Sequence, residues 1–272
     1  MRLLPLLLAA TMTTAPVLLL GQTYQNGVDA YKAGDYEAAF EIFQPLATEG
    51  DSSAQWSLGV MYENGEGVPQ DISRAIKWYR MAAEQGVATA QLNLALMYEY
   101  SKGGVPQDYA EAAKWYRMAA EQGSYVAQYF LGSMYEYGKG VAQDNAEAAK
   151  WYRMAAEQGV AGAQLILAKW YFSGRGVTQD YARSGKWYRL AAKQGDLSAM
   201  YRLSLMYWFG EGLAQNYMNA YILFNLVAAQ EVESARDYRD MAAEKLTPDQ
   251  LAEARSLSSE WEVGEPLPLQ GD

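Results

Sequence analysis

Three glutamates, Glu63, Glu99 and Glu136, occupy equivalent positions in successive repeats of this 272-residue chain, and paired carboxylates can hydrolyse glycosidic bonds. Retaining glycosidases need about 5 Å between the two carboxyl groups, and inverting ones allow up to about 9.5 Å. Adjacent layers of helices lie roughly 10 Å apart, so only the inverting geometry is conceivable. A row of acids is more typical of a repeated surface. The sequence therefore favours a protein that is not an enzyme, with a hydrolase as the weaker alternative.

The chain contains no cysteine and no histidine. Their absence excludes disulfides, Cys/His zinc sites, haem ligation by histidine, and catalytic triads that use imidazole or thiolate. The formal charge is −10, with 22 Lys and Arg residues against 32 Asp and Glu residues. Because this balance repels phosphate backbones, we expect no nucleic-acid partner. We also expect no cofactor and no metal ion.

One motif recurs along most of the chain. The string KWYR occurs four times, and its tryptophans, at 78, 115, 151 and 187, follow one another at intervals of 37, 36 and 36 residues. A second element, AQWSLGVMYENGEGVPQD at 54–71, precedes the first copy and recurs before the others. Repeats of this length indicate a stack of similar units, each of which buries its apolar face against its neighbours.

Each unit is predicted to contain two helices. The first places Ala54, Leu58 and Tyr62 on one face, and the residue after the leucine is always small. The second helix carries the repeated tryptophan, which we expect to be a core residue. Two of these second helices also have a glutamate, Glu111 or Glu147, three residues after the N-cap, as in a capping box. Their predicted N-caps are Asp71, Asp108, Asp144, Asp180 and Asn216, and their predicted stop residues are Gly86, Gly123, Gly159 and Gly195.

The pattern A-Q-x-x-L-G-x-M-Y-x-x-G-x-G-V-x-Q-D-x-x-x-A-x-K-W-Y-R-x-A-A-E-Q-G closely resembles the Sel1-like repeat, a relative of the tetratricopeptide repeat. The resemblance implies an all-α fold, a right-handed α-solenoid of helix-turn-helix units, with five Sel1-like repeats over 51–231. Residues 22–50 resemble a tetratricopeptide-like opening unit. We expect C-terminal capping helices over 232–262 and a flexible tail over 263–272. Because Glu231 replaces the stop glycine, we also expect the helix before it to continue past that residue.

The resemblance also implies a function, that of a scaffold or adaptor holding a protein or peptide partner. A cysteine-rich branch of the family binds or hydrolyses β-lactams and carries a disulfide pair in each repeat. This chain has no cysteine, so a β-lactamase-like activity is among the less favoured alternatives.

In tetratricopeptide-type stacks the first helix of each pair lines the concave face, which is where the resemblance places the partner. Aromatic side chains on such a face suit a docked peptide or helix, and they could equally stack on the sugars of cell-wall glycans such as peptidoglycan. A further alternative is that some of them only pack between repeats. The predicted partner-binding residues are Trp56, Val60, Leu92, Tyr100, Tyr129, Tyr137, Leu165, Phe172, Tyr201, Trp208 and Phe209, with acids flanking them in the first three units.

Residues 1–21 are predicted to form a signal peptide. Arg2 precedes an apolar stretch that extends to Leu20 and contains Pro5, Pro16 and three threonines, which make a poor membrane span. We therefore expect export across the inner membrane of a bacterium, to the periplasm, and no transmembrane span in the mature chain.

Overall fold

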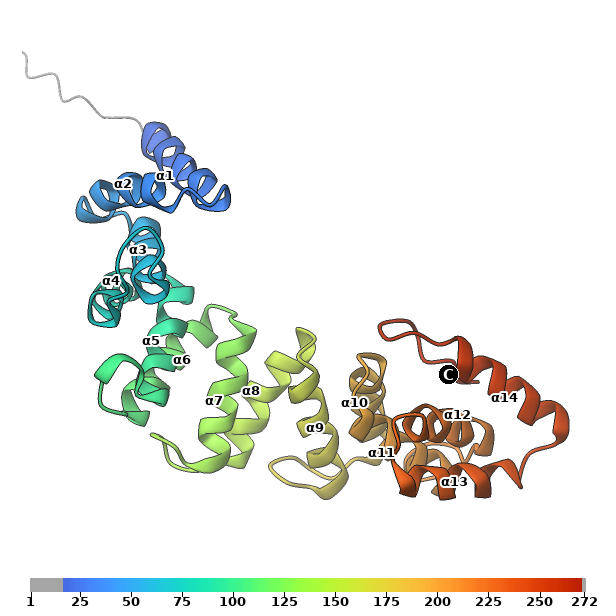
Figure 1. The fold of residues 1–272 in the computed structure, drawn as a ribbon. Helices are drawn as coiled ribbons and strands as arrows, with labels where there is room; N and C mark the ends of the chain where they lie inside the picture. The colour runs from blue at the N-terminus through green and yellow to red at the C-terminus, as the bar shows by residue number, and fades with distance from the viewer. Residues whose placement is uncertain (1–16, 271–272) are drawn as a thin grey trace, which may run out of the picture. The chain divides into compact units, whose positions relative to one another are not determined.

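The computed structural model describes residues 17–270, which form fourteen α-helices and one short 3-10 helix without any β-strand (Figure 1). The elements are α1 (Val17–Lys32), α2 (Tyr36–Thr48), α3 (Ser52–Asn64), α4 (Ile72–Glu84), α5 (Ala88–Tyr100), η1 (Lys102–Gly104), α6 (Tyr109–Glu121), α7 (Tyr125–Tyr137), α8 (Asn145–Glu157), α9 (Ala161–Ser173), α10 (Tyr181–Lys193), α11 (Leu197–Phe209), α12 (Tyr217–Ala228), α13 (Glu233–Ala243) and α14 (Pro248–Glu260). The predicted all-α fold is confirmed. Most of the predicted signal peptide, residues 1–16, lies outside the described residues.

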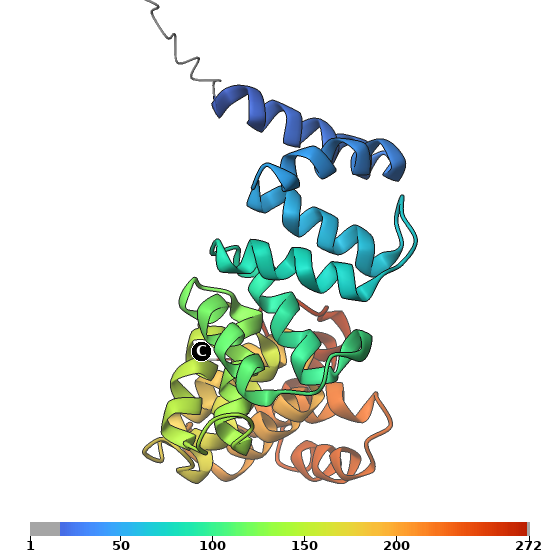
Figure 2. The same ribbon diagram turned by 90° about the vertical axis from the view of Figure 1, so that its left-hand side faces the viewer.

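The helices form two compact units, one ending at Pro106 and the other beginning at Gln107. Within the first unit, each helix from α1 to α5 packs on the next one in the chain, and within the second unit α6 to α13 do the same (Figures 1 and 2). The last helix, α14, turns back onto α12. This stacking of consecutive helix pairs is the α-solenoid architecture that the repeats predict. Between residues 17 and 270, no helix has both the length and the hydropathy needed to cross a bilayer.

The predicted helix boundaries are confirmed where they depend on local chemistry. Each of the five predicted N-cap side chains accepts a hydrogen bond from a backbone amide in the first turn of its helix. The four stop glycines have φ angles between 88° and 94°, the left-handed conformation that glycine adopts without strain. Glu111 and Glu147 pair with Lys114 (3.4 Å) and Lys150 (2.6 Å), and no capping-box bond connects them to their N-caps.

The helix predicted to continue past Glu231 ends at Ala228 instead. Glu231 itself adopts a left-handed φ of 64°, and α13 begins two residues later, at Glu233. Glu231 therefore has a positive φ angle, as the stop glycines of the earlier repeats do. A residue with a side chain adopts this conformation at a cost of about 1–2 kcal/mol. The prediction was wrong because packing of the following helix, rather than residue type, determines where α12 ends.

The tyrosine ring is buried in every KWYR motif, whereas the tryptophan ring is buried in only one of the four. Tyr79, Tyr116, Tyr152 and Tyr188 are at most 2% exposed. Of the four tryptophans predicted as core, only Trp115 is buried, and Trp78, Trp151 and Trp187 are half-buried. The prediction was therefore wrong for three of them, since helical spacing alone does not distinguish two adjacent aromatic residues.

The small residue in each first helix provides the space that the tyrosine ring fills. A Cβ atom added to Gly59 would lie 2.5 Å from the ring of Tyr79, and one added to Gly132 would lie 2.8 Å from the ring of Tyr152. Both distances are shorter than a normal carbon–carbon contact, about 3.5–4.0 Å. The glycines thus allow the two helices of a pair to approach closely around a tyrosine.

Two hydrogen bonds recur with the repeats and connect one hairpin to the next. A buried glutamine in the first helix donates Nε2 to the carbonyl of an alanine eight residues earlier, at 3.0–3.1 Å, in the pairs Gln55–Ala47, Gln91–Ala83, Gln128–Ala120 and Gln164–Ala156. The arginine of KWYR donates to a tyrosine hydroxyl 18 residues later, in the pairs Arg80–Tyr98, Arg117–Tyr135, Arg153–Tyr171 and Arg189–Tyr207. The glutamine bonds satisfy polar groups that the stack buries, and the arginine bonds lie nearer the surface.

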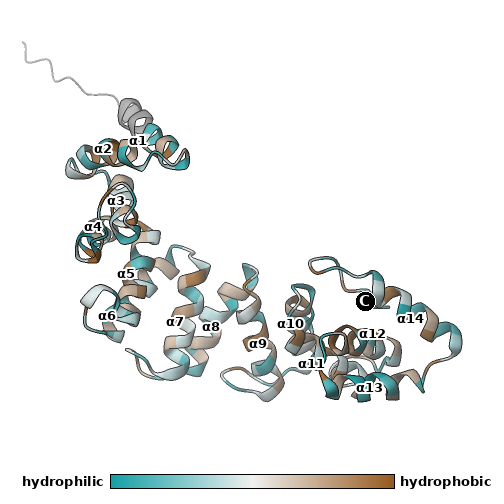
Figure 3. Cartoon of the chain, in the orientation of Figure 1, coloured by the Kyte–Doolittle hydropathy of each residue, from teal (hydrophilic) through white to brown (hydrophobic). Residues whose placement is uncertain are grey.

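Residues 263–270, predicted to be a flexible tail, start at the C-terminal end of α10, where the Gly264 amide donates to the Lys193 carbonyl (2.9 Å), and continue to α12. The buried side chain of Asn219 donates Nδ2 to the carbonyl of Gln270 (3.0 Å), and its Oδ1 accepts from the Gln270 amide (2.8 Å). Leu267 and Leu269 contact the adjacent apolar cluster, and Figure 3 shows α12 as a largely apolar helix beside the polar α13. These contacts cover apolar surface and satisfy the buried amide of Asn219.

Candidate partner-binding face

The eleven predicted partner-binding residues lie on the first helices of their pairs, but with two kinds of surroundings. Three are more than half exposed: Tyr100 (55%), Tyr137 (63%) and Phe209 (56%). The others are half-buried, namely Trp56, Val60, Leu92, Tyr129, Leu165, Phe172, Tyr201 and Trp208. The predicted set therefore mixes exposed side chains with side chains that are half-buried in the stack.

Several half-buried aromatics pack against the following helices. The ring centroid of Tyr129 lies 5.7 Å from that of Tyr152 on α8, and the ring of Tyr201 meets Phe224 on α12 edge to face, at 5.9 Å. Such pairs contribute about 0.5–1.5 kcal/mol beyond the area they bury. These residues stabilise the stack, as the alternative interpretation of the sequence allowed.

The exposed aromatics share one position, because Tyr100, Tyr137 and Phe209 are the last residues of α5, α7 and α11. Each is followed by a residue in the left-handed conformation, at which its helix ends. In α9 the same position holds Ser173, and the neighbouring Phe172 is the aromatic residue nearest to it. Aromatic surface thus recurs at the C-terminal ends of the first helices.

A groove in the second unit runs over α7, α9, α10 and α11. It consists of two adjoining hollows of about 490 and 140 Å³ that share Phe172, Tyr188 and Arg202. Tyr137 lines the larger hollow and Phe209 the smaller one. We call this surface the unit-2 groove; its other lining residues used below are Glu136, Lys169, Arg175 and Glu211.

Glu136 has its charge compensated within the unit-2 groove. Glu136 is only 5% exposed. Its carboxylate accepts a hydrogen bond from the Tyr152 hydroxyl at 2.7 Å and forms an ion pair with the Arg175 guanidinium at 3.0 Å. The guanidinium in turn lies 4.9 Å above the ring of Trp170, a cation–π contact. Burial, together with the hydrogen bond to Glu136, raises the pKa of Tyr152, so its hydroxyl stays protonated as the donor.

Two cations in the groove have no such compensation. Within residues 17–270, neither Lys169 nor Arg202 forms an ion pair. Burial raises the pKa of the nearby Tyr188 to about 12, with the Arg202 charge acting in the opposite direction. The groove therefore presents two free positive charges beside exposed aromatic rings, on a chain of net charge −10.

The glutamates considered for catalysis are buried or form hydrogen bonds and ion pairs within the stack. Glu136 is held as described, and in the first unit Glu63 accepts from the Tyr79 hydroxyl at 2.7 Å and lies 3.8 Å from Lys102. Glu99 is buried as well. Of these acids, Glu136 lines the unit-2 groove although it is only 5% exposed, and Glu99 is likewise buried. The described residues also contain no group of three or more Asp and Glu side chains able to hold a metal ion.

The sequence did not single out the cations Lys169, Arg175 and Arg202 as site residues. They come from the middle of α9, the loop after it and the start of α11, and only packing brings them together. One signal was available, because Lys169 stands where the other units carry Val60, Leu96, Ser133 or Leu205. A lysine that replaces an apolar or small residue at a repeated position indicates a local function.

Comparison with known proteins gives a consistent family assignment. A family model described as the Sel1 repeat matches six segments, residues 18–51, 52–87, 88–124, 126–160, 161–196 and 197–231. The first of these covers the stretch that resembles a tetratricopeptide-like opening unit in the sequence alone. Together the matches include all the first helices that carry predicted partner-binding residues.

Two solved structures are similar over most of the chain. One is a protective antigen of uropathogenic Escherichia coli strains with an SLR fold, 36% identical, with a TM-score of 0.74 over 89% of this chain and 53% of that one. The other is a Sel1 repeat protein from Oxalobacter formigenes, 30% identical, with a TM-score of 0.72 over 88% of this chain and 100% of that one.

Curated relatives match over shorter segments. They include an exopolysaccharide production negative regulator of Rhizobium leguminosarum bv. viciae, 35% identical over 30% of this chain and 34% of the relative. The DAP3-binding cell death enhancer 1 of Mus musculus is 48% identical over 18% of this chain and 10% of the relative. The matched segments thus span about a third or less of these relatives.

Proposed function

The chain belongs to the Sel1 repeat family, and from this premise we propose that it is an exported, non-catalytic scaffold that binds a protein or peptide through the unit-2 groove. The observation that carries the proposal is the presence of uncompensated Lys169 and Arg202 between the exposed rings of Tyr137 and Phe209. Exposed aromatic rings on a rigid surface serve as anchors in protein interfaces. Free cations beside them add selectivity for acidic partners.

The groove favours a peptide segment that carries both apolar and acidic side chains. Apolar side chains would cover Phe172 and Phe209, and a carboxylate would approach the Lys169 ammonium or the Arg202 guanidinium. Glu211 at the edge of the smaller hollow would disfavour a second acid at that end. The names of two relatives, a negative regulator and a DAP3-binding protein, describe regulation and binding, which supports the same kind of role here.

Capture of the partner inside cells tests the groove. We expect photo-crosslinking at Phe172 to recover a partner, and Phe209→Ala or Lys169→Glu to reduce the recovered amount at least tenfold, since hot-spot residues contribute about 2 kcal/mol or more. Matched controls are Tyr125→Ala, which removes an exposed aromatic outside the groove, and Lys245→Glu, which makes the same charge change on an exposed residue elsewhere in the second unit. Equal recovery with all four variants would contradict the assignment.

Sedimentation with purified sacculi tests the alternative partner, a cell-wall glycan. Exposed Tyr137 and Phe209 could stack on sugar rings. The scaffold proposal predicts no co-sedimentation. Co-sedimentation that Phe209→Ala abolishes and Lys169→Glu preserves would favour the glycan instead.

Export is supported by the basic residue and apolar runs at the start of the chain. Cell fractionation followed by intact-mass measurement tests it. We expect a periplasmic product from which an N-terminal segment ending near residue 21 has been removed. A full-length product in the cytoplasmic fraction would contradict export.

A further inference from the structure

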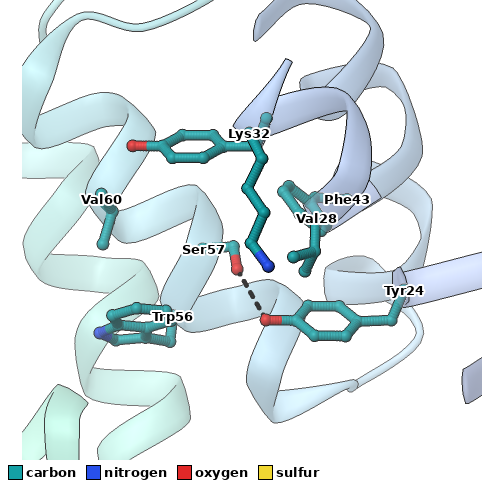
Figure 4. A pocket seen from close by; sticks show the side chains of 8 residues that line it. Tyr24, Val28, Lys32, Phe43, Trp56, Ser57 and Val60 are labelled. Atoms are coloured by element: carbon teal, nitrogen blue, oxygen red, sulfur yellow. Dashed lines mark hydrogen bonds between the residues drawn. The ribbon is translucent and has the colours of Figure 1, made fainter. Parts of the chain in front are cut away.

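The first unit contains a pocket that is separate from the unit-2 groove. Helices α1, α2 and α3 surround a space of about 260 Å³ (Figure 4). This volume is slightly below the range of about 300–1,000 Å³ that is usual for small-molecule sites. It suits a single side chain or a small organic molecule rather than a folded segment.

Carbon atoms form most of the pocket wall. Val28 from α1, Phe43 from α2 and the pair Trp56 and Val60 from α3 supply apolar surface. In Figure 4 the indole nitrogen of Trp56 lies on the side away from Val28 and Phe43, so the indole presents carbon to the pocket. An apolar group entering this space would exchange water for hydrocarbon contacts, at about 25 cal/mol for each Å² of apolar surface buried.

The polar groups at the pocket supply donors in excess of acceptors. The Lys32 side chain extends toward the pocket interior in Figure 4, beside the hydrogen-bonded hydroxyls of Tyr24 and Ser57 (3.2 Å). Two hydroxyls that share one hydrogen bond leave one O–H hydrogen for another acceptor. The Lys32 ammonium provides up to three more donors, and within residues 17–270 it forms no ion pair.

Glu66, which contacts the lining residue Tyr31, is engaged outside the pocket. Glu66 accepts hydrogen bonds from the Tyr31 hydroxyl at 2.5 Å and from the Asn64 amide at 3.2 Å. Tyr31 therefore contributes its ring to the pocket, while its hydroxyl is engaged by Glu66. Among the described residues that line the pocket, none carries a carboxylate to compensate Lys32.

From this combination we propose that the pocket binds an apolar group that carries one carboxylate. The apolar group would lie against Phe43 and Trp56, and the carboxylate would accept from Lys32 and from the free hydroxyl hydrogen of the Tyr24–Ser57 pair. This chemistry is found in small aliphatic or aromatic acids and at the C-terminal residue of a peptide. The lining residues named here, from Tyr24 to Val60, follow residue 21, so the predicted removal of the signal peptide retains them.

Titration calorimetry with the purified full chain tests the proposal. The probes are N-acetyl-phenylalanine and its amide, and two octapeptides ending in phenylalanine, one with a free and one with an amidated C-terminus. We expect binding of the carboxylates and at least about tenfold weaker binding of the amides, because hydrogen bonds to charged groups contribute about 1.5–3 kcal/mol. Binding of both carboxylates would identify a small acid as sufficient, and binding of the free peptide alone would identify a chain terminus.

Two variants distinguish the charge from the cavity. Lys32→Met keeps the apolar stem, removes the ammonium, and should weaken binding of the carboxylates about tenfold while leaving the amides unchanged. Val28→Phe should fill the space and abolish binding of every probe, with unchanged helical circular dichroism showing that the unit remains folded. Lys245→Met, the same change on an exposed lysine in the other unit, is the matched control.

The proposal is overturned if no carboxylate binds at 10 mM probe, or if Lys32→Met and Lys245→Met bind the carboxylates equally well. Because the pocket lies in the first unit and the groove in the second, these results are independent of the partner-capture experiment.

Discussion

Glu136 shows how a residue's surroundings determine whether its carboxylate is available for chemistry. In the sequence it belongs to a row of acids, and in the structure it connects a tyrosine hydroxyl, an arginine and, through that arginine, a tryptophan ring. Both oxygens of this carboxylate are already engaged, one by the Tyr152 hydroxyl and the other by the Arg175 guanidinium, so the fold occupies the atoms that a reaction would need. The same arrangement orients Arg175 at the unit-2 groove, so one buried acid also shapes the candidate binding surface.

The hydrogen bond from Tyr152 to Glu136 should be measurable as stability. We expect Tyr152→Phe to lower the unfolding free energy of the second unit by about 1.5–3 kcal/mol, because it removes a donor from a buried charged acceptor. The control Tyr125→Phe changes a tyrosine that is 52% exposed and should stay within about 0.5 kcal/mol of the parent. Urea unfolding followed by circular dichroism gives both values, and equal effects would show that the hydroxyl makes no net contribution.

At the scale of elements, the sequence predicts what neighbouring residues in the chain determine. The N-caps, the stop glycines and the small residue opposite each tyrosine all follow from interactions within one hairpin, and all are present. The end of α12 at Ala228 and the choice of Tyr188 over Trp187 as core residue depend on how the next helix packs, which spacing does not encode. The groove cations were missed for the same reason, since residues from α9, its loop and α11 meet only in three dimensions.

Substitution of two glycines in the first helices by alanine can distinguish the effect of helix propensity from the effect of packing. Ala is favoured over Gly within a helix by up to about 1 kcal/mol. At Gly132 the new methyl group would lie 2.8 Å from the Tyr152 ring, whereas at Gly162 the closest atom is 3.4 Å away. We therefore expect Gly132→Ala to destabilise the second unit by about 1–3 kcal/mol and Gly162→Ala to leave it unchanged or slightly more stable. Thermal unfolding of the two variants provides the comparison, and a stabilising Gly132→Ala would contradict the close-packing interpretation.

At the scale of the whole molecule, each unit carries one candidate site of its own, the pocket in the first and the groove in the second. Stacked repeats contact only their neighbours, so stability is a sum of local terms and an end of the stack can open by itself. The C-terminal end is closed by α14 on α12 and by the tail that Asn219 holds.

Loss of the tail contact should therefore have a local effect. We expect Asn219→Ala to remove about 1–3 kcal/mol of local stability and to accelerate amide exchange in α12 and in residues 263–270, without changing exchange in α3 and α4 of the first unit. Gln270→Ala is the comparison, because it keeps the main-chain pair with Asn219 and removes only the exposed side-chain bond from Gln270 to Glu253, so its effect should be smaller. Hydrogen–deuterium exchange with mass spectrometry reads both regions, and faster exchange throughout the chain would contradict local opening.

The arginine of each KWYR motif finds its tyrosine 18 residues ahead, always in the hairpin that follows. Recombination between two such near-identical segments of the gene would therefore delete or duplicate one complete hairpin and still leave every remaining arginine with an acceptor. The number of hairpins is thus a quantity that evolution can change in a single genetic event, which lengthens or shortens the array without creating a new junction.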